Sequence, residues 1–326
     1  MTTSRSRRSL VLRTTLIAGA GLLAAGLTHA QARYPSKPIE VIVPWPAGTS
    51  ADVGMRTVSQ ALSKQLRVPV QVINKPGGQA VIGTAEFVKA HPDGYTLGSI
   101  NIGPAVSQVI AGNAPYTMAD MTPIGIYNVL PFVVATKTDA PFKTMKELAA
   151  HAKASGKDVI LGNFGPGAVP TQTVVRMAGT DGWKAKLVAF PSPGYTQLNA
   201  GDADVVTVES INIMGQVKAG NARVLVTMTP KRLPAFPDVP TVKELGYGFD
   251  VSIWTGLFAP KGTPPEIVQT LAKALEAALQ DPGVKAYAEK SGTFFDHMSP
   301  EQTAALIQQD TAWLRPVMES LGLVKK

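Results

Sequence analysis

The stretch that decides the fold spans residues 41–52 and reads VIVPWPAGTSAD. It opens with three apolar β-branched residues, a composition typical of a buried strand, and Pro44 ends that run. A turn of small residues follows at 46–50, and from Asp52 onward the apolar residues recur at helical spacing. A strand, a tight turn and a helix start often form an anion site, because the first N–H groups of a helix have no intrahelical partners.

The composition of this turn favours a carboxylate over a nucleotide. We predict Ser50 as the N-cap, which leaves N–H groups near Asp52 open, and Ala47 and Gly48 are small enough for a ligand to approach the backbone. The turn has no Lys and lacks the Gly-x-x-x-x-Gly-Lys-Ser/Thr pattern of a P-loop. Backbone donors and hydroxyls without a cation suit a carboxylate. An ordinary capped strand-to-helix turn is the alternative interpretation.

Strand-like and helix-like segments alternate along the rest of the chain, which predicts an α/β protein with mostly parallel sheet. Strands are expected at 39–43, 70–73, 96–100, 132–136, 159–161, 186–190, 205–208, 224–227 and 254–258. Helix starts with the pattern of a capping box are expected at Thr144, Thr241, Thr263 and Ser299.

Two extended stretches, 130–137 and 249–260, are the expected junctions between domains. If the chain crosses twice, the first lobe is built from both ends of the sequence and a hinged cleft separates it from the second. Ligands of open α/β sheets bind outside the carboxyl ends of strands, and 41–52 is such an end.

A second turn of small residues, GNFGPGA at 162–168, is expected to serve the same cleft from the other lobe. It follows the strand at 159–161 and precedes a helical run at 172–177. Its Gly165-x-Gly167 pattern does not continue into a dinucleotide motif, because Pro170 stands where the third Gly belongs. A plain loop is the alternative.

The side chains that catalysis would require are scarce. There is no Cys, and His91, His151 and His297 have no second His at metal-binding spacing. The Gly-x-Ser-x-Gly elbow of hydrolases is absent. Asp52 or Asp204 would be the base of a rival secreted hydrolase or lyase. We therefore expect a binding protein, with no enzymatic activity, no cofactor and no metal ion.

The N-terminus predicts export. Four arginines lie among residues 5–13, a twelve-residue apolar stretch follows at 16–27, and Ala30-Gln31-Ala32 fits a cleavage site. This pattern is typical of a signal peptide at 1–32, with an amphipathic helix as the alternative. Without Cys, the exported protein would carry no lipid anchor, and without another long apolar segment we expect it to be soluble. Its remaining 27 basic and 23 acidic residues form no basic run with aromatics, so we expect no nucleic acid partner.

Several motifs together resemble the Bug-type receptors, the periplasmic solute-binding proteins of tripartite tricarboxylate transporters. The first is Pro44-x-Pro46-Ala47-Gly48-x-x-x-Asp52 with Arg56. Others follow in the family's order: Tyr34-Pro35-x-Lys37-Pro38, Asn74-Lys75-Pro76-Gly77-Gly78, Ile82-Gly83-Thr84, Pro92-Asp93-Gly94-Tyr95-Thr96-Leu97, Thr122-Pro123-Ile124, Pro237-Asp238-Val239-Pro240-Thr241 and Gly256-Leu257-x-Ala259-Pro260-x-Gly262-Thr263-Pro264.

The resemblance implies a type II periplasmic-binding-protein fold, with two α/β lobes and a hinged ligand cleft. With the junctions above, lobe 1 would comprise 33–132 and 255–326, and lobe 2 would comprise 133–254. It also implies a small-molecule carboxylate as the ligand and the membrane permease subunits of a tripartite tricarboxylate-type transporter as partners. We expect a monomer. A ligand-sensing partner of a membrane signalling receptor is the alternative function.

The family's ligand loops match 46–52, 164–171, 190–194 and 204–209. The expected ligand-binding residues are Trp45, Pro46, Ala47, Gly48, Thr49, Ser50, Asp52, Asn101, Phe164, Gly165, Gly167, Ala168, Thr171, Ser192, Asp204 and Glu209.

This sequence departs from the family pattern in the second lobe. Ala168 and Thr171 replace a Ser and a His of the family signature, and the usual Tyr-Lys-Gly stretch reads Phe-Pro-Ser at 190–192. These losses of polar groups favour a monocarboxylate, an aromatic acid or an amino acid over a tricarboxylate. Glu209, if it faces the cleft, would repel a second carboxylate and could pair an amine.

Overall fold

The computed structural model of the protein describes residues 34–249 and 251–325. The signal peptide predicted at 1–32 lies outside this range. The chain divides into a short unit that ends at Ser36 and a large unit that begins at Lys37. All named helices and strands belong to the large unit.

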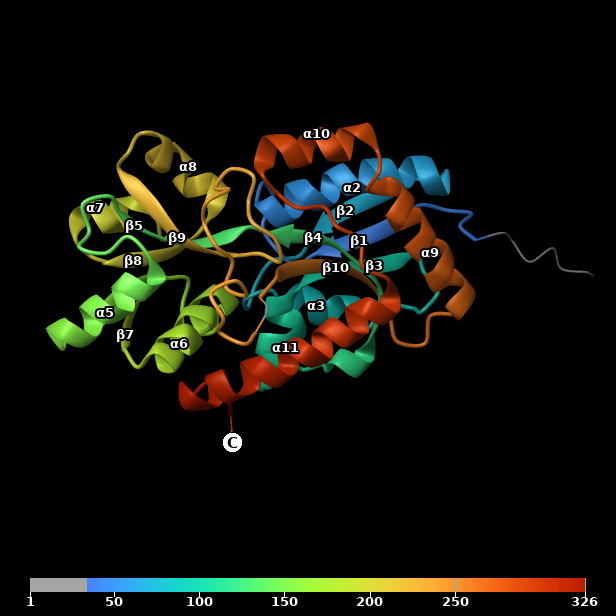
Figure 1. Ribbon diagram of the computed structural model, residues 1–326. Coiled ribbons are helices and arrows are strands. Elements are labelled where there is room, and N and C mark those ends of the chain that lie inside the picture. The colour runs from blue at the N-terminus through green and yellow to red at the C-terminus, as the bar shows by residue number, and fades with distance from the viewer. Residues whose placement is uncertain (1–33, 250, 326) are drawn as a thin grey trace, which may run out of the picture. The chain divides into compact units, whose positions relative to one another are not determined.

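Two five-stranded sheets organise the large unit (Figure 1). The first has the order β2-β1-β3-β10-β4 and is formed by β1 (Ile39–Val43), β2 (Val70–Asn74), β3 (Thr96–Asn101), β4 (Met121–Leu130) and β10 (Ile253–Pro260). The second has the order β7-β6-β8-β5-β9 and is formed by β5 (Phe132–Lys137), β6 (Val159–Asn163), β7 (Ala185–Ala189), β8 (Val205–Glu209) and β9 (Ala222–Met228).

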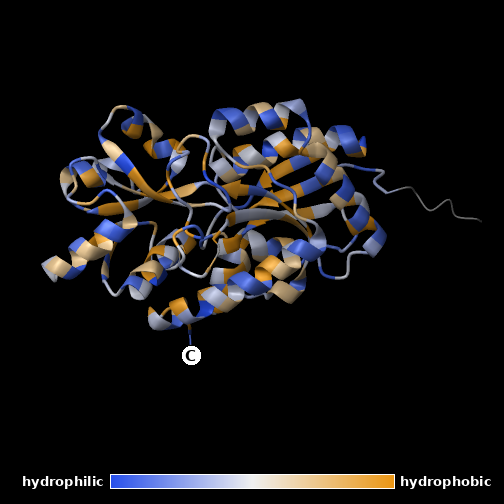
Figure 2. Ribbon diagram, viewed as in Figure 1, coloured by the Kyte–Doolittle hydropathy of each residue, from blue (hydrophilic) through white to orange (hydrophobic). Residues whose placement is uncertain are grey.

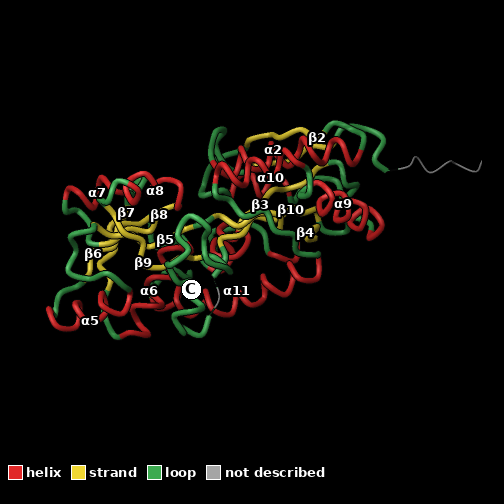
Figure 3. Tube along the Cα trace, turned by 45° about the horizontal axis from the view of Figure 1, so that its top comes forward, coloured by secondary structure: helices red, strands yellow, loops and turns green. Residues whose placement is uncertain are grey.

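Helices cover both faces of each sheet (Figures 1 and 3). Around the first sheet, α2 and α10 lie on one side and α3 and α11 on the other. Around the second sheet, α7 and α8 lie on one side and α5 and α6 on the other. The helices are α2 (Ser50–Leu66), α3 (Val81–Phe87), α4 (Gln108–Ile110), α5 (Met145–Ser155), α6 (Val169–Asp181), α7 (Tyr195–Ala200), α8 (Ser210–Lys218), α9 (Pro265–Ala278), α10 (Pro282–Ser291) and α11 (Pro300–Ser320), with a π-turn η1 (Gly103–Ser107) and a 3-10 turn η2 (Met118–Asp120).

The expectation of mostly parallel sheet holds for strand direction, with one exception in each sheet: β10 in the first and β5 in the second run against the other four strands. Strand β1 pairs in parallel with β2 and β3, and β6 with β7 and β8, but β10 is antiparallel to β3 and β4, and β5 to β8 and β9. The reason lies in the two crossings. Strands β5 and β10 enter their sheets from the other sheet, so they start at the edge where their neighbours end. The register shows this: Phe132 lies opposite Glu209 and Met228, and Ile253 lies opposite Leu130.

The chain changes sheet at Pro131 and again between β9 and β10, within or close to the predicted junctions. The exact lobe boundaries, 132/133 and 254/255, stay predictions. Hydrophobic residues concentrate in the strands (Figure 2), and every residue of β10 is buried. Its Trp254 Nε1 donates to Asp310 Oδ2 of α11 at 2.7 Å, and Trp313 Nε1 donates to Asp310 Oδ1 at 2.9 Å. These bonds fix α11 against the first sheet.

Of the four predicted capping boxes, one is complete before its helix and a second is half formed. Ser299 forms the full capping box before α11. Before α5, Thr144 Oγ1 accepts from Glu147 N as expected of an N-cap, but the Glu147 carboxylate accepts from Lys143 N instead of Thr144 N, so the reciprocal half of the box is absent there. At the third, α9 begins at Pro265, and the hydroxyl of Thr263 donates back to the Pro260 carbonyl instead of capping.

The fourth predicted cap, at Thr241, is a correction. Thr241 Oγ1 accepts from Glu244 N at 3.2 Å and Glu244 Oε2 accepts from Thr241 N at 2.8 Å, so the reciprocal bonds of a capping box are present. The segment nevertheless forms only turns. Arg232 Nε bonds both carboxylate oxygens of Glu244 at 3.0 Å, and this contact joins the turn to the loop after β9.

Candidate functional site

The predicted ligand loops gather where strands end. In the first sheet β1, β2 and β3 end at one edge, and in the second β6, β7 and β8 end at the edge where β5 begins. Those are the two edges that the chain joins at Pro131. The turns at 44–49 and 164–168 therefore lie on the same side of the crossing as Glu209.

The opening turn places its helix start one residue earlier than predicted. Thr49, with extended backbone angles, is the N-cap of α2, and its Oγ1 accepts from Asp52 N at 3.4 Å and donates to Pro46 O at 2.8 Å. Ser50 is the first helical residue, which corrects its assignment as the cap. Its hydroxyl is therefore not used for capping, and it donates to Glu209 Oε2 at 2.8 Å.

The buried carboxylate of Asp52 holds the turn in place. The residue is 2% exposed, and its carboxylate accepts from Gly48 N at 2.9 Å, Asn74 Nδ2 at 2.8 Å and Arg56 Nε at 3.0 Å. Burial alone would raise the pKa of this carboxyl, but the hydrogen bonds from Gly48, Asn74 and Arg56 outweigh it and lower the pKa. Asp52 thus shapes the loop and occupies the Gly48 N–H. Its carboxylate is buried and already engaged by three donors.

Two backbone donors stay open at the start of α2. Within the described part of the chain, the N–H groups of Ser50 and Ala51 donate to no acceptor, because the Thr49 side chain and carbonyl engage only the next two. Gly48 has φ +83, and a Cβ built there meets no heavy atom within 4 Å. The turn therefore presents open N–H groups, the positive end of a helix dipole and clear space.

A cavity of about 190 Å³ lies at the start of α2, against Gly48 and Ser50. It is lined by Gly48, Ser50, Val53, Pro131, Glu209, Ile211, Tyr287, Ser291 and Thr293. These described lining residues include no Lys, Arg or His. Burial raises the pKa of Glu209, against the opposing effect of its bond from Ser50. Burial also raises the pKa of Tyr287, and the nearby negative charge of Glu209 raises it further.

The second turn is shaped by a buried amide. Asn163 Oδ1 accepts from Gly165 N at 2.7 Å, and its Nδ2 donates to Leu161 O at 2.8 Å. Gly165 has φ +105, which a side chain rarely adopts. Phe164 is 40% exposed and packs edge-on against Phe132 at a ring distance of 5.7 Å. The loop thus holds an aromatic side chain at the crossing.

The remaining predicted residues have varied surroundings. Gly167 faces the first sheet's side, because a Cβ there would lie 3.9 Å from Gln79 Oε1. Thr171 is fully buried at the start of α6, and its hydroxyl has no partner among the described residues. Asn101 ends β3, and its Oδ1 accepts from Gly103 N at 3.1 Å. The others are partly or fully exposed in their loops: Trp45, Pro46, Ala47, Ala168 and Ser192.

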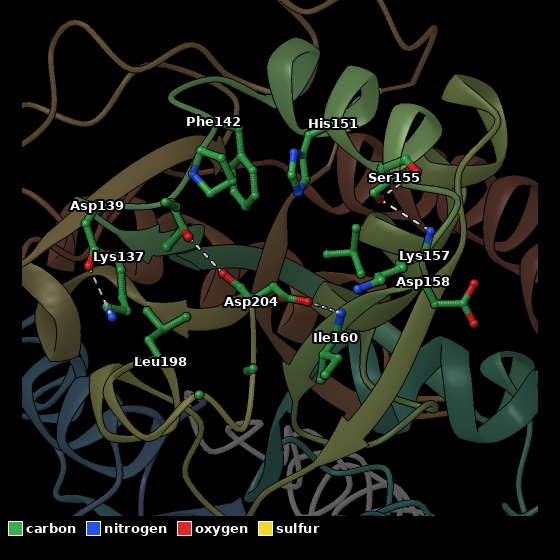
Figure 4. A pocket seen from close by; sticks show the side chains of 17 residues that line it. Lys137, Asp139, Phe142, His151, Ser155, Lys157, Asp158, Ile160, Leu198 and Asp204 are labelled. Atoms are coloured by element: carbon green, nitrogen blue, oxygen red, sulfur yellow. Dashed lines mark hydrogen bonds and ion pairs between the residues drawn. The ribbon is translucent and has the colours of Figure 1, made fainter.

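Asp204 does not join this group. It precedes β8, whereas Glu209 ends it, so five residues of extended chain, roughly 16 Å, separate the two positions. Asp204 lines a different groove, of about 660 Å³, together with Lys137, His151 and others (Figure 4). Its Oδ2 accepts from Ile160 N at 2.7 Å, and this bond ties β8 to β6.

Sequence reasoning missed the part of the cavity that α10 supplies. Tyr287 and Ser291 lie in its last turns, and Thr293 follows them; Ser291 Oγ donates to Tyr287 O at 2.7 Å. A polar helix with no small-residue turn gives no sign of a ligand site. Only the contact of α10 with α2 brings these residues to the opening turn. Val53 and Ile211 are apolar residues at helix starts, and their exposure was equally unpredictable.

Two general features of the described residues bear on the site. No helix among them is both long and apolar enough to cross a membrane. No group of three or more His, Cys, Asp or Glu side chains within the same ranges is arranged to hold a metal ion.

Comparison with known proteins gives a consistent result. Residues 55–323 match the family described as the tripartite tricarboxylate transporter family receptor, TctC. A UPF0065 protein from the TAR-I ttuE-ttuC′ intergenic region of Agrobacterium vitis is 35% identical over 262 residues, 79% of this chain and 76% of that protein.

Solved structures agree with the sequence match. A TctC solute-binding protein from Polaromonas, solved without ligand, is 30% identical with a TM-score of 0.79 and covers 88% of this chain and 99% of its own. MatC from Rhodopseudomonas palustris, with bound malate, is 26% identical with a TM-score of 0.70 and covers 87% and 99%. These matches confirm the predicted periplasmic-binding-protein fold with two α/β lobes.

Proposed function

Because the chain belongs to the receptor family of the tripartite tricarboxylate transporters, we propose that it captures a small carboxylate and delivers it to the membrane subunits of such a transporter. Members of this family are periplasmic binding proteins, so we place the mature protein in the periplasm and its partners in the adjoining membrane. Ligand that contacts both lobes only when they are closed would shift the population toward the closed form.

The observation that carries this proposal is the pair of open N–H groups at Ser50 and Ala51 beside a cavity. Such donors, together with the helix dipole, stabilise one negative charge without a cation. Asp52 and Asn74 hold the turn in this form before ligand arrives, so little ordering is left for binding to do.

The size and charge of the cavity support a ligand with one carboxylate. A volume of about 190 Å³ suits a small acid, and the lining residues that the structure describes offer no cationic side chain for a second or third carboxylate. We therefore favour a monocarboxylate, an aromatic acid or an amino acid over a tricarboxylate. The malate in the MatC structure is a small carboxylate bound to a family relative.

Neither candidate base for an enzymatic reaction suits catalysis. Asp52 is buried under three hydrogen bonds, and Asp204 lies at the far end of β8. We therefore propose binding without chemistry.

A carboxylate panel tests the proposal. Protein that has been unfolded, dialysed and refolded would be screened by thermal unfolding against propionate, benzoate, nicotinate, amino acids, succinate, malate and citrate. A ligand at about 100 times its Kd adds roughly 2.7 kcal/mol of stability, which raises Tm by a few degrees. We expect a shift from at least one acid with a single carboxylate and none from citrate. A panel in which citrate alone shifts Tm, or in which no acid does, would refute the proposal.

A further inference from the structure

We propose that Glu209 selects an α-amino acid with a small apolar side chain, by pairing its ammonium group while the turn at 48–51 holds its carboxylate. This inference rests on the proposed function and names the ligand class of the same site. It is carried by the position of Glu209, the charge of the cavity and the exposure of two apolar side chains.

The position of Glu209 sets the spacing between the two ends of the ligand. Ser50 connects the two groups that would hold the ligand. Its N–H is one of the open donors for the carboxylate, and its hydroxyl oxygen lies 2.8 Å from Oε2 of Glu209, which would hold the ammonium group. A cation on Glu209 and an anion on the turn would therefore sit only a few ångströms apart. One carbon separates these groups in an α-amino acid.

Glu209 also has acceptor capacity left for an ammonium group. A carboxylate has about four lone-pair sites, and among the described residues its only hydrogen-bond donor is the Ser50 hydroxyl. The described residues that line the cavity supply no positive charge. A carboxylate in such surroundings is costly to ionise unless it is paired, so a ligand that brings its own cation is favoured.

The same carboxylate disfavours a dicarboxylate. A second negative group on the ligand would face Glu209 at short range with no cation between them. A monocarboxylate has no second negative group but leaves the Glu209 carboxylate unpaired. The order of affinity should therefore be amino acid, then monocarboxylate, then dicarboxylate.

The apolar side of the cavity indicates the side chain. Val53 and Ile211 are 36% and 40% exposed, which is unusual for such residues in the folded chain, and both line the cavity beside Pro131. An aliphatic side chain on the ligand would cover them and gain about 25 cal/mol per Å² of apolar area removed from water. The volume of about 190 Å³ limits that side chain to a small one.

Calorimetric titration with matched pairs tests the inference on the refolded, full-length mature protein. The pairs are L-alanine with propionate, L-valine with isovalerate, and L-leucine with isocaproate, each of which differs only by the ammonium group. Succinate supplies the dicarboxylate. The variants are Glu209→Gln, which keeps the size of the side chain and an acceptor for Ser50, and Glu276→Gln, which removes a carboxylate on α9 as the control.

We expect at least one amino acid to bind at least tenfold more tightly than its partner acid, and succinate to bind most weakly. Glu209→Gln should reduce that ratio to about threefold or less while the partner acid binds at least as tightly as before, because a nearby negative charge is removed; Glu276→Gln should leave the ratio unchanged. Equal affinities within every pair, or a ratio that survives in Glu209→Gln, would overturn this inference and leave the proposed function intact. If no carboxylate binds, including those of the wider panel, both fail.

Discussion

Replacement of Gly48 by alanine separates the binding role of the opening turn from its structural role. Gly48 has φ +83, and a Cβ at this position meets no heavy atom within 4 Å. The variant therefore suffers backbone strain of about 1–2 kcal/mol, the usual cost of the left-handed region for a residue with a Cβ, and no steric clash. Gly48 lines the cavity together with Ser50, so we expect the new methyl group to occupy space that the ligand needs. We expect the affinity for a carboxylate to fall at least tenfold, which is about 1.4 kcal/mol.

Gly262 provides the matched control. It lies in the turn before α9 with φ +87, and a Cβ there also meets nothing within 4 Å, so Gly262→Ala should have the same strain. Urea unfolding of both variants should give similar losses of free energy of unfolding, and calorimetry should show weakened binding only in Gly48→Ala. Unchanged affinity in Gly48→Ala, or equal weakening in both variants, would refute the assignment of the turn as the carboxylate site.

Two further substitutions test how the site is held in place. Asp52→Asn should lower the free energy of unfolding in urea by about 1–3 kcal/mol, because it removes the charge that holds the turn; a loss below roughly 0.5 kcal/mol would contradict this. Hydrogen bonds lower the pKa of Asp52 below 3.8 despite its burial. The stability that the ionised carboxylate contributes is therefore fully present above pH 3.8 and is lost as the pH falls through the lowered pKa. The difference in free energy of unfolding between wild type and Asp52→Asn should accordingly shrink when the urea series is repeated in acid. Asp310→Asn should cost about 1–3 kcal/mol in the same assay, since an amide N–H₂ would face one of the indole N–H groups of Trp254 and Trp313; unchanged stability and tryptophan fluorescence would argue against the arrangement.

The strands could be predicted from the sequence where a short run of apolar residues forms a buried strand. Nine of the ten were expected because they are short apolar runs, and β4 was missed. It contains Pro123 and Gly125, which indicate turns elsewhere. Inside this strand they are tolerated: β10 pairs with β4 through two register shifts, and a Cβ at Gly125 would lie 2.7 Å from Met298 O. Tertiary packing here decides against local propensity.

Capping patterns could be found from the sequence, but their exact use could not. Thr49 and Ser50 are both good N-cap residues, and the choice of Thr49 depends on the extended backbone that Asp52 and Gly48 impose on the turn. At Thr241 the local bonds form as the pattern predicts, but no helix follows. Local hydrogen bonding therefore fixes a turn, and the segments beyond it decide whether a helix grows.

The site was predictable where a residue directly follows a strand. Glu209 ends β8 at the crossing edge and faces the cavity, whereas Asp204 precedes the same strand and lies in another groove. The resemblance identified the segment 204–209 as a whole, and only the strand direction distinguishes its two ends. Tyr287 and Ser291 belong to a distant helix, and no local pattern could connect them with the opening turn.

A crystal structure of the refolded protein with the panel acid that raises Tm most would test the central claim directly. We predict a carboxylate with oxygens about 2.7–3.2 Å from the backbone nitrogens of Ser50 and Ala51, beside Gly48 and between the ends of β1 and β8. A ligand bound elsewhere, such as in the groove that contains Asp204, or one whose carboxylate contacts neither nitrogen, would contradict that claim.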